Sequence, residues 1–374
     1  MAQQNQFDVA VIGGGLVGAA IAWGMRSLGP KLALLDEGDV AYRASRGNFG
    51  LVWVQGKGTG LPPYGSWTQL SARRWPELAA ALVAETGIDP ELVQPGGFHV
   101  CLTPRELDAR VAALERLLAQ PGFERYDVEV LDRATLAQRL PGIGPDVAGA
   151  TWCAKDGHCD PLRLLYALHA GLGRAECAYR PSHGVSRITP HAGGFDLSTP
   201  EGTLTARKVV LAAGLGNAAL APMVGLRVPV RPQKGQVIVL ERVRPFLSQP
   251  LSTIRQTADG TVLIGDSQQE LGFDETLGLA VLATMAERAQ RVFPLLSEVR
   301  VNRTWAALRV MTPDGLPVYE QSAAHPGAFV ATCHSGVTLA AAHAYALAPA
   351  IVAGALPDSF TSFSARRFDV PQAA

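Results

Sequence analysis

The chain has 374 residues, of which 48% are hydrophobic, and it carries 33 basic and 33 acidic side chains. This length accommodates two domains of ordinary size, and the hydrophobic content supports substantial cores. Because the charges balance and no long run has one sign, electrostatics gives no reason to expect binding to nucleic acid, a membrane surface or a polyanion. The partners of this protein must therefore be inferred from its motifs.

No segment has the character of a targeting signal or a membrane span. The first six residues lead directly into a strand, without the basic segment and apolar core of a secretion signal. No later apolar run is long enough to cross a bilayer. We expect a cytoplasmic protein with no membrane span.

The cysteines predict neither a disulfide framework nor a metal centre. Their odd number and the lack of a C-x-x-C pair argue against both closed disulfides and an iron–sulfur cluster signature. Cys153 and Cys159 lie close to His158 in the sequence, but a metal site would need a fourth ligand and a better spacing. We predict free thiols near a turn and no metal site.

The N-terminal segment has the pattern of a dinucleotide site. A β-branched strand runs into a G-x-G-x-x-G turn (Gly13, Gly15, Gly18), an Ala-rich helix follows, and a second strand ends at Asp36. These glycines allow a tight turn, close approach of a pyrophosphate and close packing of helix on strand, so that the phosphates meet the helix N-terminus. Asp36 is then expected to accept a hydrogen bond from a ribose hydroxyl. The alternative is a plain glycine-rich strand–helix turn.

The rest of the chain alternates between two sets of elements. Hydrophobic periodicity and turn residues predict, in chain order, a glycine-punctuated loop at 44–58, a helix over 67–86, a strand over 98–103, a helix over 104–118, a helix capped by Asp160, a hairpin of 194–199 with 203–206, a buried strand over 208–214, strands over 236–240 and 261–264, a helix over about 275–293, a strand over 328–332 and a last helix opened by 334–338.

This alternation predicts an α/β fold with two domains that are each discontinuous in sequence. A Rossmann-like, dinucleotide-binding domain is expected to comprise residues 1–76, 146–220 and 304–374. A second, α+β substrate domain, with a mixed sheet flanked by helices, is expected to comprise residues 77–145 and 221–303.

Several segments in fixed order carry a family resemblance. They are the glycine turn at 13–18, Asp156–Pro161, Ala213–Gly214, Arg231–Gln236, Asp259–Gly265 and Leu308–Arg309 before Thr312–Gly315. Through them nearly the whole chain resembles the FAD-dependent amine and amino-acid oxidoreductases of the D-amino-acid oxidase and glycine oxidase type. Within that group, residues 47–58 resemble the FAD-bearing β subunit of D-hydroxyproline dehydrogenase and its relatives in opine oxidase and hydrogen cyanide synthase.

The resemblance implies FAD as the cofactor, bound noncovalently because no cysteine clearly occupies the position that sarcosine oxidases use. The residues implied to contact it are Gly13, Gly15, Leu16, Val17 and Gly18 around the diphosphate, Asp36 and Glu37 near the adenosine ribose, Ser45, Arg46 and Asn48 at the phosphates or flavin edge, Gly50 and Leu51 along the isoalloxazine, Val185 at the adenine, Ala213 and Gly214 beside it, and Gly336, Val337 and Thr338 around the pyrimidine ring. The loop at His334–Gly336 is shorter than in many relatives.

The chemistry implied by the resemblance is oxidation of an amine to an imine by hydride transfer from Cα–H to flavin N5. The protein must hold the substrate carboxylate so that Cα lies about 3 to 3.5 Å from N5, and a guanidinium can do this with two hydrogen bonds. Arg309 is the predicted group, because it follows a hydrophobic strand and matches the carboxylate-binding arginine of glycine oxidase. The alternative is an Arg309 that is paired with a structural acid such as Asp314.

Other side chains are candidates for the same pocket. Trp53 and Gln55 could supply a wall and a polar contact, although an aromatic residue in a Val-rich strand is equally typical of a core. His334 could be an acid or base, but a hydrogen-bonded structural role is favoured because a neutral amine needs no strong acid. Lys57 and Lys234 are expected to be solvated or to line the pocket, without a catalytic role.

The predicted function is oxidation of a secondary or cyclic amino acid of the cis-4-hydroxy-D-proline or D-proline type, with electrons passed to a partner or quinone. Leu263 matches the position of a lysine that promotes oxygen reactivity in sarcosine oxidases, which mildly favours a dehydrogenase. The resemblance also implies further subunits, including a small iron–sulfur protein. The alternatives are a glycine/sarcosine-type oxidase that uses oxygen, the FAD subunit of an opine oxidase complex, an NAD-dependent reductase and a non-catalytic FAD subunit.

Overall fold

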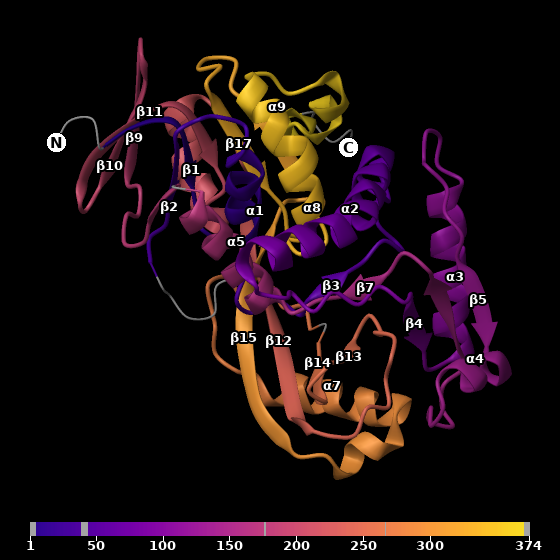
Figure 1. The fold of residues 1–374 in the computed structure, drawn as a ribbon. Helices are drawn as coiled ribbons and strands as arrows, with labels where there is room; N and C mark the ends of the chain where they lie inside the picture. The colour runs from indigo at the N-terminus through magenta and orange to yellow at the C-terminus, as the bar shows by residue number, and fades with distance from the viewer. Residues whose placement is uncertain (1–4, 39–43, 176, 266, 370–374) are drawn as a thin grey trace.

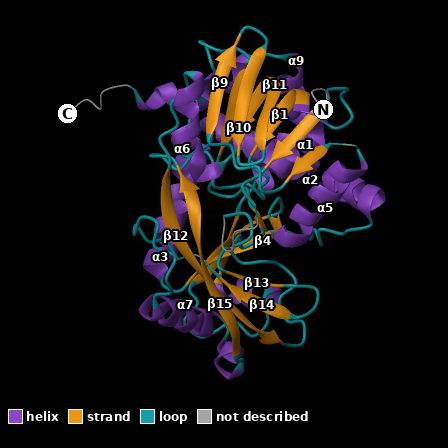
Figure 2. Cartoon of the chain, turned by 90° about the vertical axis from the view of Figure 1, so that its left-hand side faces the viewer, coloured by secondary structure: helices purple, strands orange, loops and turns teal. Residues whose placement is uncertain are grey.

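A twisted sheet built around the N-terminal strand forms one half of the molecule (Figures 1 and 2). The computed structural model describes residues 5–38, 44–175, 177–265 and 267–369. The strands of this sheet lie in the order β16 (Val318–Gln321), β17 (Ala328–Thr332), β11 (Gly202–Leu211), β1 (Gln6–Ile12), β2 (Leu32–Leu35) and β8 (Ala178–Arg180), and β10 (Gly194–Thr199) with β9 (Arg187–His191) extends β11 as antiparallel strands. The pairs around β1 are parallel, as a Rossmann-like fold requires.

Helices cover both faces of this sheet because its central strands are hydrophobic on both sides. Val9, Val11 and Val210 face one cluster, and Ala10 with Leu211 face the other. The helical elements are α1 (Leu16–Met25), α2 (Pro62–Thr86), α5 (Pro161–Arg174), α6 (Asn217–Leu220), α8 (Ala340–Ala342), a π-helical turn (His343–Leu347), α9 (Ala348–Ala353) and 3₁₀ turns at Gly214–Gly216, Ala221–Val224, Asp358–Phe363 and Ala365–Phe368.

The second half contains two further sheets that share one core. An antiparallel sheet has the order β13 (Ile254–Gln256), β14 (Thr261–Ile264), β12 (Arg231–Arg242) and β15 (Val301–Met311), next to α7 (Leu279–Val292) and a 3₁₀ turn at Pro294–Glu298. A smaller sheet has the order β4 (Gly97–Cys101), β6 (Gly149–Cys153) and β5 (Glu129–Asp132), next to α3 (Pro104–Leu118) and α4 (Arg133–Arg139). A two-stranded ladder of β3 (Leu51–Val52) and β7 (Gly157–His158) lies between the halves (Figure 1).

The strand pairing also shows where the predicted domain boundaries fall. The boundary at 145/146 comes just before β6, which pairs with β4 and β5, and the boundary at 303/304 lies inside β15, which pairs along β12. Both strands therefore hydrogen-bond to the sheets of the second half. The division into a dinucleotide part and a substrate part stays a prediction.

Several predicted elements are confirmed, and their ends show what local pattern leaves out. The helix over 104–118 and the strand over 328–332 have the predicted bounds. The helix predicted from residue 67 begins at Pro62, and the last helix begins at Ala340, although the Leu339 N–H already donates to the Ser335 carbonyl at 3.0 Å. The first of these helices begins at the Pro62–Pro63 pair, a start signal that apolar periodicity does not mark, and residues 336–339 form a turn.

Within the described residues, no single helix is long and apolar enough to cross a membrane. One pair of helical segments, Ala340–Ala353 and Asp358–Phe368, is long and apolar enough when taken together but is bent by 112°.

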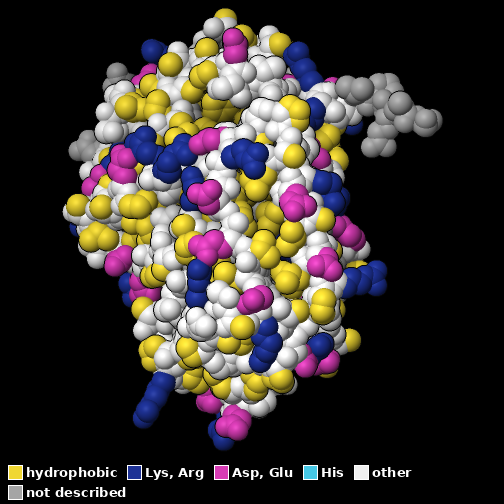
Figure 3. All heavy atoms as spheres, turned by 90° about the vertical axis from the view of Figure 1, so that its right-hand side faces the viewer, with side chains coloured by type: hydrophobic (Ala, Val, Ile, Leu, Met, Phe, Trp, Pro, Cys, Tyr) yellow, Lys and Arg dark blue, Asp and Glu magenta, His cyan; other side chains and the backbone are white. Residues whose placement is uncertain are grey.

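The surface mixes charged and apolar side chains. Lysines, arginines and acidic residues are interspersed with apolar side chains on the face drawn in Figure 3.

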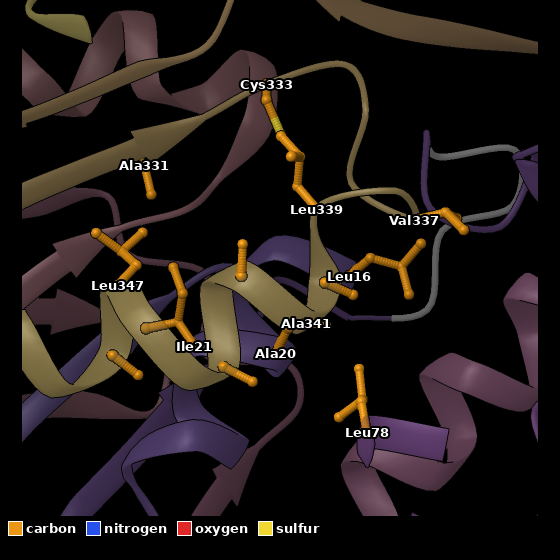
Figure 4. Close-up of a cluster of buried hydrophobic side chains, with 14 of the residues drawn as sticks. Leu16, Ala20, Ile21, Leu78, Ala331, Cys333, Val337, Leu339, Ala341 and Leu347 are labelled. Carbon is orange, nitrogen blue, oxygen red and sulfur yellow. The ribbon is translucent and has the colours of Figure 1, made fainter. Parts of the chain in front are cut away.

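Helix α1 packs closely against the last helical segment. Leu16, Ala20 and Ile21 of α1 belong to the same buried cluster as Leu339 and Leu347, as Figure 4 shows. Further along α1, Gly24 faces the backbone of Ala344, and a Cβ at this glycine would overlap the Ala344 carbonyl oxygen. This packing depends on a residue without a side chain.

We predict that Gly24→Ala destabilises the protein by about 1–3 kcal/mol, because the added methyl forces two helix backbones apart. The free energy of unfolding in urea measures this change. Gly173→Ala in α5 is the matched control, since a Cβ at Gly173 meets nothing within 4 Å. It should stabilise by about 0.5–1 kcal/mol through helix propensity. Equal effects of the two substitutions would contradict the packing argument.

Candidate active site

One cavity of about 1130 Å³ runs from the glycine turn of the first sheet to strands β12 and β15 of the second half. This volume is larger than that of most sites for one small ligand, about 300–1,000 Å³, and leaves room for a dinucleotide and a small substrate together. Gly13 and Asp36 line one end, and Gly235 and Arg309 line the other.

The glycine-turn end is a preformed cradle. The turn at Gly13 has φ of +110°. The Gly14 N–H donates to Asp36 Oδ2 at 2.6 Å, and the Leu16 N–H at the start of α1 donates to Ser45 Oγ at 2.9 Å. Backbone N–H groups at a helix N-terminus suit phosphates, and the Asp36 carboxylate can accept from a ribose hydroxyl. The residues present therefore fit the diphosphate and ribose of a dinucleotide.

Nearly all of the predicted cofactor-contacting residues line this cavity. They are Gly13, Gly15, Leu16, Val17, Asp36, Glu37, Ser45, Arg46, Asn48, Leu51, Val185, Ala213, Gly214, Gly336, Val337 and Thr338. Gly18 lies behind the turn, packed against the Gly13 carbonyl, as its predicted packing role requires. Gly50 does not line the cavity, because its backbone pairs with Cys159 and a Cβ there would meet the Cys159 carbonyl.

Sequence reasoning missed an aromatic pair beneath the glycine turn. His169 of α5 lines the cavity, and its Nε2 lies 2.8 Å from the Gly14 carbonyl oxygen. Its ring stacks on Tyr179 at 4.6 Å between centroids. Burial lowers the pKa of His169, which favours the neutral ring. Local pattern predicts the helix that contains His169, but only the packing of α5 against the turn brings this ring to the cavity.

The opposite end of the cavity is polar and includes three of the predicted substrate-site residues. Arg309 lies on β15 above Gly235 of β12, and its Nη1 donates to the Ser267 carbonyl at 2.7 Å. Trp53 and His334 also line this end. Asp314, the acid named in the alternative, accepts from Arg367 at 2.8 Å.

Sequence reasoning did not single out two further side chains at this end. His99 of β4 lies 3.1 Å from Ser252 Oγ through its Nδ1, and both side chains line the cavity. Strand alternation could have indicated His99, because it points away from the face of Phe98 and Val100. Lys57 lines the cavity, which is one of the two placements predicted for it.

Gln55 does not lie where the sequence predicts. The sequence predicts it as a polar contact in the pocket, but it is 2% exposed and does not line the cavity. Its amide nitrogen donates to Asp156 Oδ2 at 2.7 Å, and its amide oxygen accepts from Arg110 at 2.8 Å. Because the side chain points to this buried network, Gln55 supports the loop and is not part of the cavity wall.

Lys234 is a second correction to the expected placements. This lysine is 2% exposed, and its ammonium donates to Asp274 at 2.6 Å and to the Thr276 carbonyl at 2.9 Å. It is neither solvated nor part of the cavity wall, because it is buried and its ion pair with Asp274 holds the 271–278 segment against β12. Among the described residues, no group of histidines, cysteines and acids has the arrangement of a metal site, and the Cys153 and Cys159 thiols are free.

The electrostatics of the substrate end keep its histidines neutral. Burial lowers the pKa of His334 to about 3, and the nearby Lys57 and Arg309 charges act in the same direction. Burial likewise lowers the pKa of His99 to about 4. Burial raises the pKa of the Cys333 thiol to about 12, so this lining cysteine is protonated. The cations of this end are therefore Lys57 and Arg309, among the side chains that the structure places there.

Comparison with known proteins agrees with this architecture. Residues 8–350 match the family described as DAO, FAD dependent oxidoreductase. The chain is 46% identical to an opine oxidase subunit of Agrobacterium tumefaciens (strain Ach5) over 98% of this chain and 99% of that protein, and 27% identical to glycine oxidase of Geobacillus kaustophilus (strain HTA426) over 88% of each. The crystal structure of glycine oxidase from Bacillus cereus ATCC 14579 superimposes with a TM-score of 0.86 at 24% identity, covering 96% of this chain and 99% of that one.

The chain belongs to the DAO family of FAD-dependent oxidoreductases. It is an enzyme whose cofactor is FAD, and the NAD-dependent alternative is excluded. The glycine turn, Asp36 and Ser45 are the groups that would hold the diphosphate and ribose at one end of the cavity.

We predict that Asp36→Ala weakens FAD binding by about 10- to 100-fold, because a charged hydrogen-bond acceptor for the ribose is lost. Titration of the apoprotein with FAD, followed by the quenching of flavin fluorescence, measures this. Asp8→Ala is the control, since Asp8 accepts from Lys31 N–H on the same sheet and does not line the cavity. An unchanged dissociation constant in Asp36→Ala would remove Asp36 from the ribose site.

We predict that Gly235→Ala selectively weakens binding of a carboxylate ligand. A Cβ at Gly235 would lie 2.5 Å from Arg309 Nη1, so the methyl must push the guanidinium aside. The dissociation constant for a carboxylate inhibitor should rise by about 10-fold or more, with FAD content unchanged. Binding is measured from the ligand-induced change in the flavin spectrum. Gly173→Ala is the control, since a Cβ there meets nothing within 4 Å and Gly173 does not line the cavity. Equal inhibitor binding in both variants would show that Arg309 does not hold the carboxylate.

Proposed function

We propose that this enzyme oxidises the C–N bond of a secondary amino acid to an imine, with Arg309 binding the substrate carboxylate. The observation that carries the proposal is the Arg309 guanidinium, which lines the cavity above Gly235 and is held by the Ser267 carbonyl. A planar guanidinium fixed in this way can orient a carboxylate with two hydrogen bonds. The dinucleotide end of the same cavity supports a flavin beside the substrate.

The side chains at the substrate end favour a neutral amine. Bound FAD would supply the two-electron oxidant, which accepts the hydride of the substrate Cα–H. Lys57 and Arg309 create a positive potential that lowers the pKa of a bound ammonium, because the charged form is repelled. With its pKa of about 3, His334 stays neutral and can accept a hydrogen bond from the amine. The substrate thus loses a hydride from carbon and a proton from nitrogen.

Two kinds of secondary amino acid are candidates. The resemblance of residues 47–58 favours a cyclic substrate of the cis-4-hydroxy-D-proline or D-proline type. The 46% identity to a protein named as part of an opine oxidase favours an opine, in which the amine nitrogen joins two carboxylate-bearing carbons. Glycine or sarcosine, the first of which is named in the glycine oxidase relative, is the smaller alternative.

We further propose that the electrons leave through another subunit. A relative that is 46% identical carries the name of a subunit, which supports a hetero-oligomer. A small iron–sulfur protein is the proposed acceptor, and a quinone or oxygen is the alternative. Leu263 gives little support to either a protein partner or oxygen as the electron acceptor. It packs with Val237 and Val239 and does not line the cavity.

The test is anaerobic bleaching of the flavin band by separate additions of cis-4-hydroxy-D-proline, D-proline, sarcosine, glycine and octopine. One class of secondary amine should reduce the flavin, and Arg309→Ala should lower kcat/KM for it by roughly 30- to 1000-fold, equivalent to about 2–4 kcal/mol. Arg303→Ala, an exposed position on the same strand that stacks on Trp305, is the matched control. Full activity of the Arg309→Ala enzyme in its complex would instead show that the chain is a non-catalytic FAD subunit.

A further inference from the structure

Lys57 is a fixed cation in the cavity. It lies on the loop after β3, where the Gly56 N–H donates to Tyr126 at 2.9 Å and the Gly58 carbonyl accepts from Gln120 at 3.1 Å. These bonds hold the backbone on both sides of the lysine. Its ammonium reaches the cavity wall and donates to Ser335 Oγ at 3.2 Å.

No ion pair of the Lys57 ammonium is found among the described residues. An ammonium has three N–H donors, and among the described residues the structure gives Lys57 a single acceptor, Ser335 Oγ, and no carboxylate. Ser335 also accepts from Tyr64 at 3.0 Å, so its hydroxyl is held in place. A partly buried cation without a counter-ion is costly, and its natural complement is an anionic group of the ligand.

Lys57 and Arg309 both lie near the His334–Ser335 turn. Lys57 touches Ser335, and the fields of both cations reach the adjacent His334. Arg309 comes from β15 in the second half of the molecule, whereas Lys57 comes from the loop beside α2. A ligand that lies near His334 is therefore within reach of two cations supplied by different parts of the chain.

We propose that Lys57 binds a second carboxylate of the substrate, which is therefore an N-(carboxyalkyl) amino acid, a secondary amine flanked by two carboxylates. This inference rests on the proposed function and narrows it to the opine-type candidate. Arg309 holds the carboxylate next to the carbon that is oxidised, and Lys57 with Ser335 holds the other. A cyclic monocarboxylate leaves Lys57 without a counter-ion, and this disfavours that class.

The test uses two ethers that the enzyme cannot oxidise. Diglycolate has two carboxylates across an ether oxygen, and methoxyacetate has one. Each is titrated into the oxidised holoenzyme, and binding is read from the flavin spectrum. Wild-type enzyme should bind diglycolate about 10- to 100-fold more tightly, as expected for one added charged hydrogen-bonded contact. Lys57→Gln should abolish this preference, because it should weaken diglycolate binding far more than methoxyacetate binding.

Two control variants separate the contribution of the Lys57 charge from the general effect of removing a lysine. Lys57→Arg should keep part of the preference, because it retains the charge. Lys155→Gln should keep all of it, since Lys155 contacts Gln69 and does not line the cavity. Equal binding of the two ethers by wild-type enzyme, or no binding of diglycolate, would overturn the proposal. So would a Lys57→Gln enzyme with an altered flavin potential and an unchanged preference for diglycolate, which would assign Lys57 to the flavin.

Flavin reduction by the wild-type enzyme tests the proposed function separately from ether binding. Iminodiacetate and sarcosine differ by one carboxylate and are compared as anaerobic reductants of the flavin. If neither these nor other secondary amino acids reduce it while diglycolate keeps its preference, the proposed function fails and the Lys57 site stands. If sarcosine and iminodiacetate both reduce the flavin with equal apparent dissociation constants, the function stands and the Lys57 site fails.

Discussion

The buried carboxylate of Asp156 is the interaction on which the substrate end of the cavity depends. It accepts from the backbone N–H groups of Val54 and Gln55 at 2.5 and 3.2 Å and from the Gln55 side chain at 2.7 Å. Burial raises the pKa of Asp156 to about 7, and these hydrogen bonds act in the opposite direction. Because a buried acid must be satisfied, these hydrogen bonds hold the backbone between Trp53 and Lys57, and both of these side chains line the cavity.

Charged side chains line both ends of the cavity. Asp36 and Arg46 lie toward the glycine-turn end, and Arg309 and Lys57 lie toward Gly235 and Ser335. His99 and His334 also line the cavity, and both are neutral because burial and nearby cations lower their pKa values. One continuous cavity therefore has room for a dinucleotide at one end and, under the proposed function, an amino acid at the other.

Different parts of the chain build the two ends of the cavity. The dinucleotide end consists mainly of backbone held by the parallel sheet, so that its geometry depends on packing at the glycine turn and α1. The substrate end takes Arg309 from an antiparallel strand pair, with Gln233 opposite Arg309 in the ladder. Side chains there can change without altering the cofactor cradle, which allows one fold to serve different amine substrates.

The sequence by itself determined the dinucleotide motif, the fold class, several helices and strands, and the family. These follow from local pattern: glycine spacing, hydrophobic period and capping residues act over a few neighbours. Motifs in fixed order also indicated Arg309 and most of the cofactor-lining residues. Only the tertiary structure decided that Gln55 turns inward to Asp156, that Lys234 is buried in an ion pair, and that Lys57 shares a cavity with Arg309. Those outcomes depend on contacts between residues far apart in the chain, where the direction of a side chain is set by which partner satisfies its charge or hydrogen bonds.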